Sequence, residues 1–129
     1  MKVLVVEDDR SIQMVLEFVL TRMCKCQVLV ASDGRQGLNL IQAQKPDVVL
    51  LDLMLPEMDG FEVCQRAKAD DATRHIPIIF LTAQPQPASV ARAMALGAAG
   101  YLVKPFDPIK IIDQINEALT RVQAPLITK

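Results

Sequence analysis

The chain has 129 residues, 51% of them hydrophobic, so it is long and apolar enough to bury a core and is not expected to be disordered. Its 14 basic and 15 acidic residues give a formal net charge of −1, and no basic run occurs. This balance gives no electrostatic footprint for nucleic acid or for an anionic membrane surface. We expect one globular domain that binds neither directly.

The first apolar run and the cysteines indicate where the protein resides. Residues 3–6 are apolar, but three acids follow at once, so the run is too short for a signal peptide or a membrane span. Cys24, Cys26 and Cys64 cannot form an even disulfide framework. We predict a cytoplasmic protein with reduced thiols.

Short apolar runs rich in Val, Ile and Leu alternate along the chain with segments of helical spacing. None of the runs alternates apolar with polar residues, which is typical of strands buried on both faces. Five strand–helix repeats predict a doubly wound α/β fold, a five-stranded parallel sheet with helices on both faces. The predicted strands are residues 3–6, 28–31, 48–51, 76–81 and 101–103.

Local signals set the predicted ends of the later helices. Asp107 and Pro108 have the residue types of an N-cap and a first helical position, so they are expected to open the last helix. Gly97 follows the fourth helix, where a C-terminal glycine is expected. We predict a domain of residues 1–122, with residues 123–129 as a tail or the start of a linker.

Chemically related side chains directly follow four of the five predicted strands. In an open parallel sheet, ligands bind beyond the carboxyl ends of the strands. If the strand order is 2-1-3-4-5, the first and third strands are neighbours and their acids come together. The residues at these strand ends are Glu7, Asp8, Asp52, Thr82 and Lys104.

Three carboxylates in one small site either raise a pKa strongly or recruit a cation, and hard oxygen ligands suit Mg²⁺. Transfer of a phosphoryl group onto a carboxylate requires a metal ion beside that carboxylate, with a lysine and a hydroxyl group opposite. Asp52 would be the nucleophile, Lys104 would neutralise a phosphoryl oxygen, and Thr82 would hydrogen-bond another.

The strings VLVVEDD, VVLLDLMLPEMDG, IIFLTA and GYLVKPF together resemble the receiver (response-regulator) family of bacterial two-component systems over residues 2–122. The resemblance implies a flavodoxin-like strand order of 2-1-3-4-5. It also implies a phosphoryl donor, either a histidine kinase or a histidine phosphotransfer protein, and a downstream target protein or output domain. The chain would catalyse only its own phosphotransfer and slow dephosphorylation, and would not otherwise be an enzyme.

The resemblance assigns roles to the metal-binding residues one by one. Asp52 matches the phosphoacceptor, and Asp8 matches the direct ligand of Mg²⁺. Glu7 would act on the metal largely through water, and the backbone carbonyl of Met54 would complete the protein ligands. Asp9 lies outside this set and is expected to cap the first helix.

The same resemblance predicts a switch. Thr82 matches the hydroxyl that moves toward the phosphoryl group, and Tyr101 matches the aromatic residue that then turns inward. Lys104 matches the phosphate-binding lysine, whose bond to Pro105 is usually cis in the family. The face formed by the fourth helix, fifth strand and fifth helix would change as the populations of two states shift.

Two positions near the site bear on how long the phosphoryl group survives: Met54, two residues after the acceptor, and Gln84, two after the threonine. Met54 cannot position an attacking water, so slow self-dephosphorylation is expected. The sequence of residues 85–87, Pro-Gln-Pro, departs from the usual opening of the fourth helix, and residues 98–100 lack the acidic pattern of DNA-binding members that dimerise. We therefore do not predict that dimer.

Three other functions are compatible with a strand-end aspartate or with this topology. An aspartyl phosphatase needs a second acid two residues after the first, where Met54 stands, and a flavin-binding module needs more aromatic residues than the 4% present. A receiver fold that serves as an interaction module without phosphorylation is the main alternative, although all five expected side chains are present.

Overall fold

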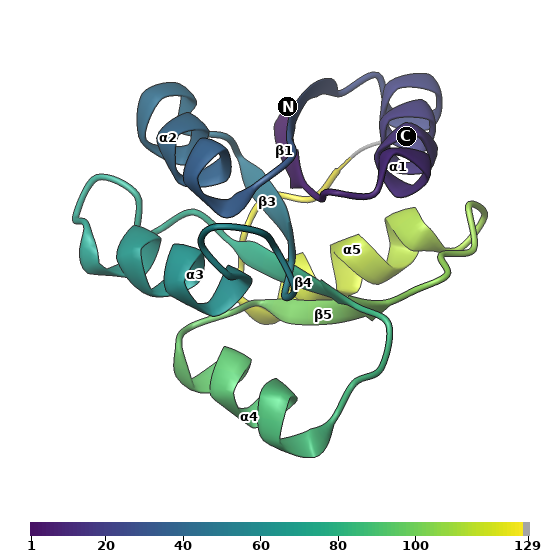
Figure 1. The fold of residues 1–129 in the computed structure, drawn as a ribbon. Coiled ribbons are helices and arrows are strands. Elements are labelled where there is room, and N and C mark those ends of the chain that lie inside the picture. Colours follow the sequence, from purple (N-terminus) through teal and green to yellow (C-terminus); the bar gives the residue numbers. More distant parts are fainter. Residues whose placement is uncertain (128–129) are drawn as a thin grey trace.

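The structure is a computed structural model that describes residues 1–127. The strands are β1 (Lys2–Val6), β2 (Gln27–Ala31), β3 (Val48–Asp52), β4 (Ile78–Thr82) and β5 (Gly100–Val103). The helices are α1 (Arg10–Cys24), α2 (Gly34–Gln44), α3 (Gly60–Ala69), α4 (Pro87–Ala95) and α5 (Ile111–Arg121). All strands are parallel, in the order β2-β1-β3-β4-β5 (Figure 1). The predicted doubly wound fold is confirmed.

Each face of the sheet has its own apolar core. Helices α1 and α5 cover one face, while α2, α3 and α4 cover the other (Figure 1). Alternate residues of a central strand serve both cores: Leu50 packs toward α1 and α5, and Leu51 packs toward the opposite helices. Every residue of β3 and β4 is buried, as continuous apolar runs in central parallel strands require.

The two edge strands are less buried than the sequence pattern predicts. Most of β2 is only half-buried, and Tyr101 and Val103 of β5 are 41% and 44% exposed. The prediction that every run is buried on both faces is therefore wrong for β2 and β5. The physical reason is that the helices cover the centre of the sheet more completely than its edges.

Two of the predicted helix boundaries are confirmed. The Asp9 side chain accepts hydrogen bonds from the backbone N–H groups of Ser11 and Ile12, at 2.8 and 3.3 Å, and so caps α1. Gly97 follows α4 with a φ of 95°, a left-handed conformation that glycine adopts without strain.

Two other boundaries differ from the prediction. Helix α5 begins at Ile111, so Asp107 and Pro108 do not open it. Instead, Asp107 caps a separate short turn, in which its side chain accepts from the N–H of Ile109 at 2.9 Å. Strand β4 begins at Ile78, two residues later than predicted, because the proline directly before it has no N–H to donate to the ladder.

Helix α4 is the helix least embedded in the fold. Among its nine residues only Ala93 is buried. Its N-cap residue, Gln86, makes no side-chain capping bond, and Pro87 occupies the first turn. Helix α4 therefore rests on the sheet through a small contact, whereas α1 and α5 each bury five residues.

The chain beyond α5 folds back onto the domain. The side-chain amide of Asn116 makes two hydrogen bonds with the backbone of Ile127, donating to its carbonyl at 2.9 Å and accepting from its N–H at 2.8 Å. Ile127 is 2% exposed and packs in the core between α1 and α5. Of the predicted tail, residues 123–127 are thus attached to the domain, and residues 128–129 lie outside the described residues.

This packing predicts that the tail contributes to stability. Ile127→Ala should lower the free energy of unfolding by about 2–4 kcal/mol, because it leaves a cavity in the core. Leu126→Ala is the matched control, since Leu126 is 46% exposed and should change stability little. Urea unfolding of both variants checks this, and equal stabilities would contradict it.

Candidate functional site

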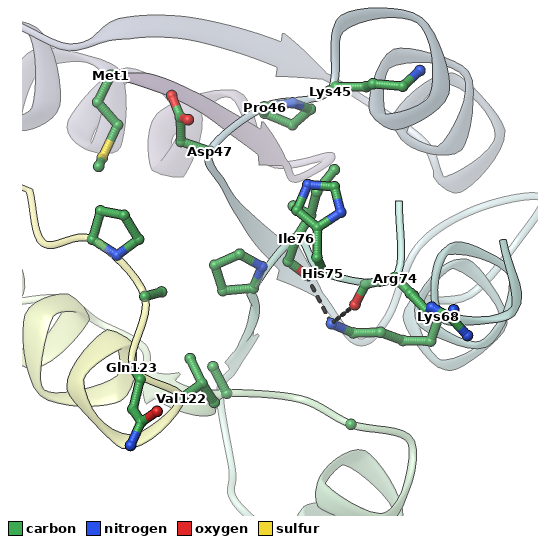
Figure 2. A pocket seen from close by; sticks show the side chains of 15 residues that line it. Met1, Lys45, Pro46, Asp47, Lys68, Arg74, His75, Ile76, Val122 and Gln123 are labelled. Carbon is green, nitrogen blue, oxygen red and sulfur yellow. Dashed lines mark hydrogen bonds between the residues drawn. The ribbon is translucent and has the colours of Figure 1, made fainter. Parts of the chain in front are cut away.

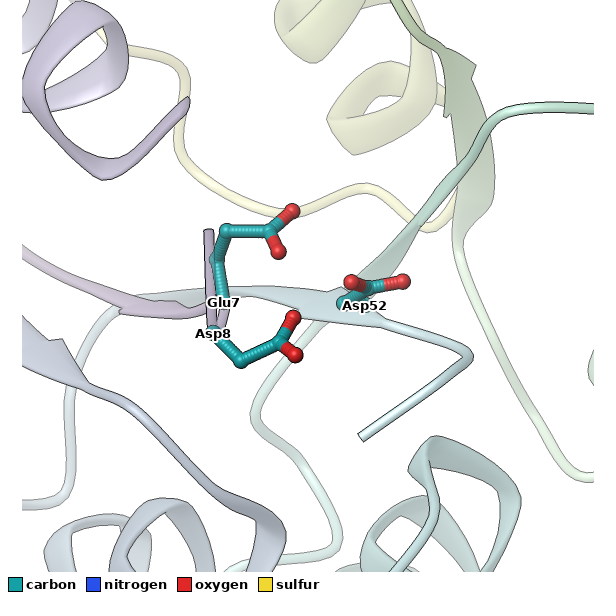
Figure 3. Close-up of side chains that lie close together, drawn as sticks. All are labelled: Glu7, Asp8 and Asp52. Atoms are coloured by element: carbon teal, nitrogen blue, oxygen red, sulfur yellow. The ribbon is translucent and has the colours of Figure 1, made fainter. Parts of the chain in front are cut away.

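The carboxyl edge of the sheet brings together three acids from two neighbouring strands. Glu7 and Asp8 follow β1, and Asp52 is the last residue of β3, which pairs with β1. Their carboxylates point toward one another (Figure 3), and one oxygen from each lies within 4.8 Å of the others. Glu7 and Asp52 are buried, whereas Asp8 is exposed. The predicted cluster is therefore present.

Lys104 is the cation that faces this cluster. Its Nζ lies 2.6 Å from Oε1 of Glu7 and 3.0 Å from Oδ2 of Asp52. The lysine follows β5, so its side chain reaches across β4 to the acids. The Lys104–Pro105 peptide bond is cis, as the sequence resemblance implied.

Burial and the neighbouring charges shift the ionisation of two of these groups. Desolvation by burial raises the pKa of Glu7 to about 7, against the opposing bond to Lys104 and with a further rise from nearby Asp52. Burial by itself would lower the pKa of Lys104, but its bonds to Glu7 and Asp52 outweigh that effect and raise it. The lysine is thus held in its charged form beside the carboxylates.

The loop after β3 packs closely around Asp52. The N–H of Met54 donates to Oδ1 of Asp52 at 3.1 Å, which fixes the direction of the carboxylate. Gly60 lies against the backbone of Asp52, where a Cβ atom would collide with the carbonyl oxygen. The Asp59 side chain accepts from the N–H of Glu62 at 2.9 Å and caps α3. The loop therefore shapes the rim of the cleft beside Asp52 and starts α3.

Thr82 ends β4 beside the cluster, and α4 begins five residues later. Its hydroxyl donates to the carbonyl of Gln84 at 3.1 Å. The acceptor is a backbone carbonyl of the loop after β4, which no sequence pattern could identify. Tyr101 lies on the adjacent edge strand β5, with its side chain partly exposed.

The acidic cluster and Lys104 lie in a cleft of about 660 Å³. Its lining contains Glu7, Asp8, Asp52, Thr82 and Lys104, so the structure gathers all five residues that the sequence indicated at the strand ends. It also contains residues that sequence reasoning missed, and these come from the starts of α3 and α4. They are Phe61, Gln86 and Ser89.

The donor set of the cleft fits a hard divalent cation. Carboxylate oxygens are the ligands that Mg²⁺ takes from proteins, and an ion with several retained waters needs only a few of them. Of the three carboxylates, that of Asp8 is exposed and the other two are buried. Glu7, Asp8 and Asp52 could therefore hold Mg²⁺ at the mouth of the cleft.

A second hollow of about 510 Å³ lies at the opposite end of the sheet (Figure 2). Both of its lysines donate to backbone carbonyls: Nζ of Lys68 to Arg74 and Ile76 at 3.0 and 2.8 Å, and Nζ of Lys45 to Gln42 at 2.8 Å. Helices α2 and α3 end here, and cations stabilise the carbonyl ends of helices. We assign this hollow a structural role.

Comparison with known proteins gives the family. Residues 3–116 match the family model described as the response regulator receiver domain. The chain belongs to this family. In two-component signalling it is therefore the receiver domain of a response regulator, and the sequence-based resemblance is confirmed.

Relatives and solved structures agree with this assignment. A probable transcriptional regulator, ycf27 of Guillardia theta, is 43% identical over 120 residues, covering 93% of this chain and 46% of the relative. The transcriptional regulatory protein AfsQ1 of Streptomyces coelicolor is 41% identical over 118 residues, covering 92% and 51%. The chain thus spans about half the length of these curated relatives.

Two solved receiver structures superimpose closely. Chemotaxis protein CheY4 of Vibrio cholerae has a TM-score of 0.85 and 33% identity, covering 92% of this chain and 98% of that one. The receiver domain of the sensor histidine kinase PA1611 of Pseudomonas aeruginosa has a TM-score of 0.81 and 29% identity, covering 95% and 98%. That structure has a magnesium ion coordinated in its active site cleft.

No helix in the described part of the chain has the length and apolar character that crossing a membrane requires. Its three cysteines are not joined by disulfides, and burial raises the pKa of the Cys64 thiol to about 11.

The raised pKa of Glu7 makes stability depend on pH. Its folded value of about 7 exceeds the ordinary 4.5, so the stabilisation that it confers is complete below pH 4.5 and is lost as the pH rises through 7. Without divalent cations, wild-type stability relative to Glu7→Gln should fall by about 1–3 kcal/mol between about pH 5 and about pH 8. Urea unfolding in chelator checks this, and a constant difference would refute it.

Proposed function

We propose that this receiver domain accepts a phosphoryl group on Asp52, in a reaction that requires Mg²⁺. The observation that supports the proposal most directly is the placement of Lys104, which lies within 3.0 Å of both Glu7 and Asp52 while Asp8 borders the same cluster. A carboxylate acceptor, a cation and a set of hard ligands are the groups that phosphoryl transfer needs.

The proposed step exchanges one bond for another. A carboxylate oxygen of Asp52 attacks phosphorus, and the phosphorus–nitrogen bond of a phosphohistidine donor breaks. The bonding electron pair leaves with the imidazole, which takes up a proton. Lys104 neutralises charge on the incoming phosphoryl oxygens. Glu7, Asp8, Asp52 and the Met54 carbonyl would hold Mg²⁺, which when bound neutralises charge on the phosphoryl group.

Phosphorylation would change the surface through Thr82. Its hydroxyl would exchange the carbonyl of Gln84 for a phosphoryl oxygen, and Tyr101 on the neighbouring strand would turn from its partly exposed position toward the vacated space. The surface made by α4, β5 and α5 would then favour a different partner, as a shift between two populated states.

The proposed partners follow from this role. The donor is a histidine kinase or a histidine phosphotransfer protein, and the recipient is a target protein or an output domain. Relatives named as transcriptional regulators are about twice as long as this chain. We infer that this domain does not contact nucleic acid itself, acts in the cytoplasm, and has no enzymatic activity beyond its own phosphorylation and slow dephosphorylation.

Phosphorylation by acetyl phosphate tests the proposal. With Mg²⁺, the intact mass of the wild type should increase by one phosphoryl group, and neither Asp52→Asn nor wild type in chelator should show the adduct. Asp59→Asn is a control, because Asp59 caps α3 outside the cluster and should leave the adduct in place. No adduct on the wild type would favour the phosphorylation-independent interaction module instead.

The side chain at residue 54 should set the lifetime of the phosphoryl group. Met54 is 81% exposed beside the cleft and cannot orient a water by hydrogen bonds. Met54→Asn supplies an amide that can do so, and should speed dephosphorylation several-fold, about 3-fold or more. Following the loss of the adduct by mass spectrometry checks this, with Met54→Leu as the control, and an unchanged rate would count against it.

A further inference from the structure

Gln13 is a buried polar residue that the proposed reaction does not use. It lies in the first half of α1, three and seven residues before Leu16 and Leu20, on the face of the helix that meets the core. Its side chain is buried, with 5% of the residue exposed. A buried amide needs hydrogen-bond partners, because an unmet polar group inside a protein is costly.

The partners of Gln13 belong to the loops at the carboxyl edge of the sheet. Its Nε2 donates to the backbone carbonyl of Glu7 and, at 3.1 Å, to the hydroxyl of Ser32. The N–H of Ser32 in turn donates to Oε1 of Gln36, at 2.9 Å, at the start of α2. One amide therefore ties the loop that follows β1 to the loop that follows β2.

The carbonyl that Gln13 holds belongs to the peptide between Glu7 and Asp8. The direction of that peptide sets where the next residue, Asp8, places its carboxylate. Glu7 is held elsewhere by its own N–H, which donates to Ala31 at 3.0 Å, and by its carboxylate, which pairs with Lys104. The remaining polar group of the Glu7 backbone is its carbonyl, and the side chain of Gln13 holds it by a hydrogen bond.

We propose that Gln13 is a positioning residue for the Mg²⁺ site, which orients Glu7 and Asp8 by holding the peptide between them. This inference rests on the proposed function for the identity of the ion. Groups that orient metal ligands without touching the metal commonly change metal affinity about 10- to 100-fold when they are removed. The Asp9 N–H also donates to Oε2 of Glu7, at 3.1 Å, but Asp8 itself is exposed, and the bond from Gln13 holds the carbonyl of the peptide that leads into Asp8.

The test measures Mg²⁺ binding directly, without any phosphoryl donor. Gln13→Met keeps the length of the side chain and removes both donated hydrogen bonds. We expect its Mg²⁺ dissociation constant, from titration followed by amide resonances in NMR spectra, to rise about 10-fold. The amide resonances of Glu7 and Asp8 should also shift in the metal-free variant.

The matched control removes an equivalent bond far from the site. The Thr73 hydroxyl, on a residue 1% exposed, donates to the carbonyl of Ala67 at 2.7 Å, at the other end of the molecule. Thr73→Val should lower stability but leave Mg²⁺ affinity unchanged. If both variants bind Mg²⁺ as tightly as the wild type, Gln13 serves only the stability of the fold and the proposal is overturned.

A second variant keeps the proposal testable if Gln13→Met does not fold. Ser32→Ala removes one of the two acceptors of Gln13 at a residue outside the core, and should weaken Mg²⁺ binding in the same direction by a smaller factor. Wild-type affinity in Ser32→Ala would then overturn the proposal. Mg²⁺ binding without phosphorylation in the wild type would contradict the proposed function alone, and leave the role of Gln13 standing.

Discussion

Mutual repulsion among three carboxylates is the constraint on which the rest of the site depends. Glu7, Asp8 and Asp52 lie within 4.8 Å of one another, and two of them are buried. Such a group is stable only if a cation compensates it or if one acid keeps its proton. Lys104 provides the cation from the far side of β4. Its bond lowers the pKa of Glu7, but desolvation by burial outweighs that effect and, with a further rise from Asp52, holds the pKa above its ordinary value.

The fold supplies this arrangement through the order of its strands. Because β1 and β3 are adjacent and parallel, their polar ends coincide, while the apolar residues before them fill two separate cores. Within one strand, therefore, the apolar residues stabilise the fold, and the polar residue at the carboxyl end contributes to the ionic site. Leu51 is wholly buried in a core, and Asp52, the next residue, faces the cleft.

Much of this could be predicted from the sequence, and the exceptions have physical causes. Apolar runs and the acids that follow them are local signals, so the five strands and the residues of the cluster were all predictable. Burial at the sheet edges was not, because it depends on how far the helices extend over β2 and β5. Asp107 does act as a cap, as its residue type predicts, but it caps the turn before α5 and does not open the helix.

The interactions that sequence reasoning missed join residues that have no shared local pattern. Thr82 finds its acceptor on a loop carbonyl, and Asn116 holds the backbone of Ile127 eleven residues later. Gln13 did leave a signal, since it is a polar residue in line with Leu16 and Leu20 on a core-facing helix surface. Its partner, a backbone carbonyl, could be identified only from the folded chain.

The small buried contact of α4 determines how much free energy is needed to move this helix. The free energy needed to move a helix grows with the apolar area that it must uncover, about 25 cal/mol for each Å². Helix α4 anchors itself through one small residue, Ala93, whereas α1 and α5 would each expose five buried side chains. Moving α4 would therefore uncover less buried apolar surface than moving α1 or α5.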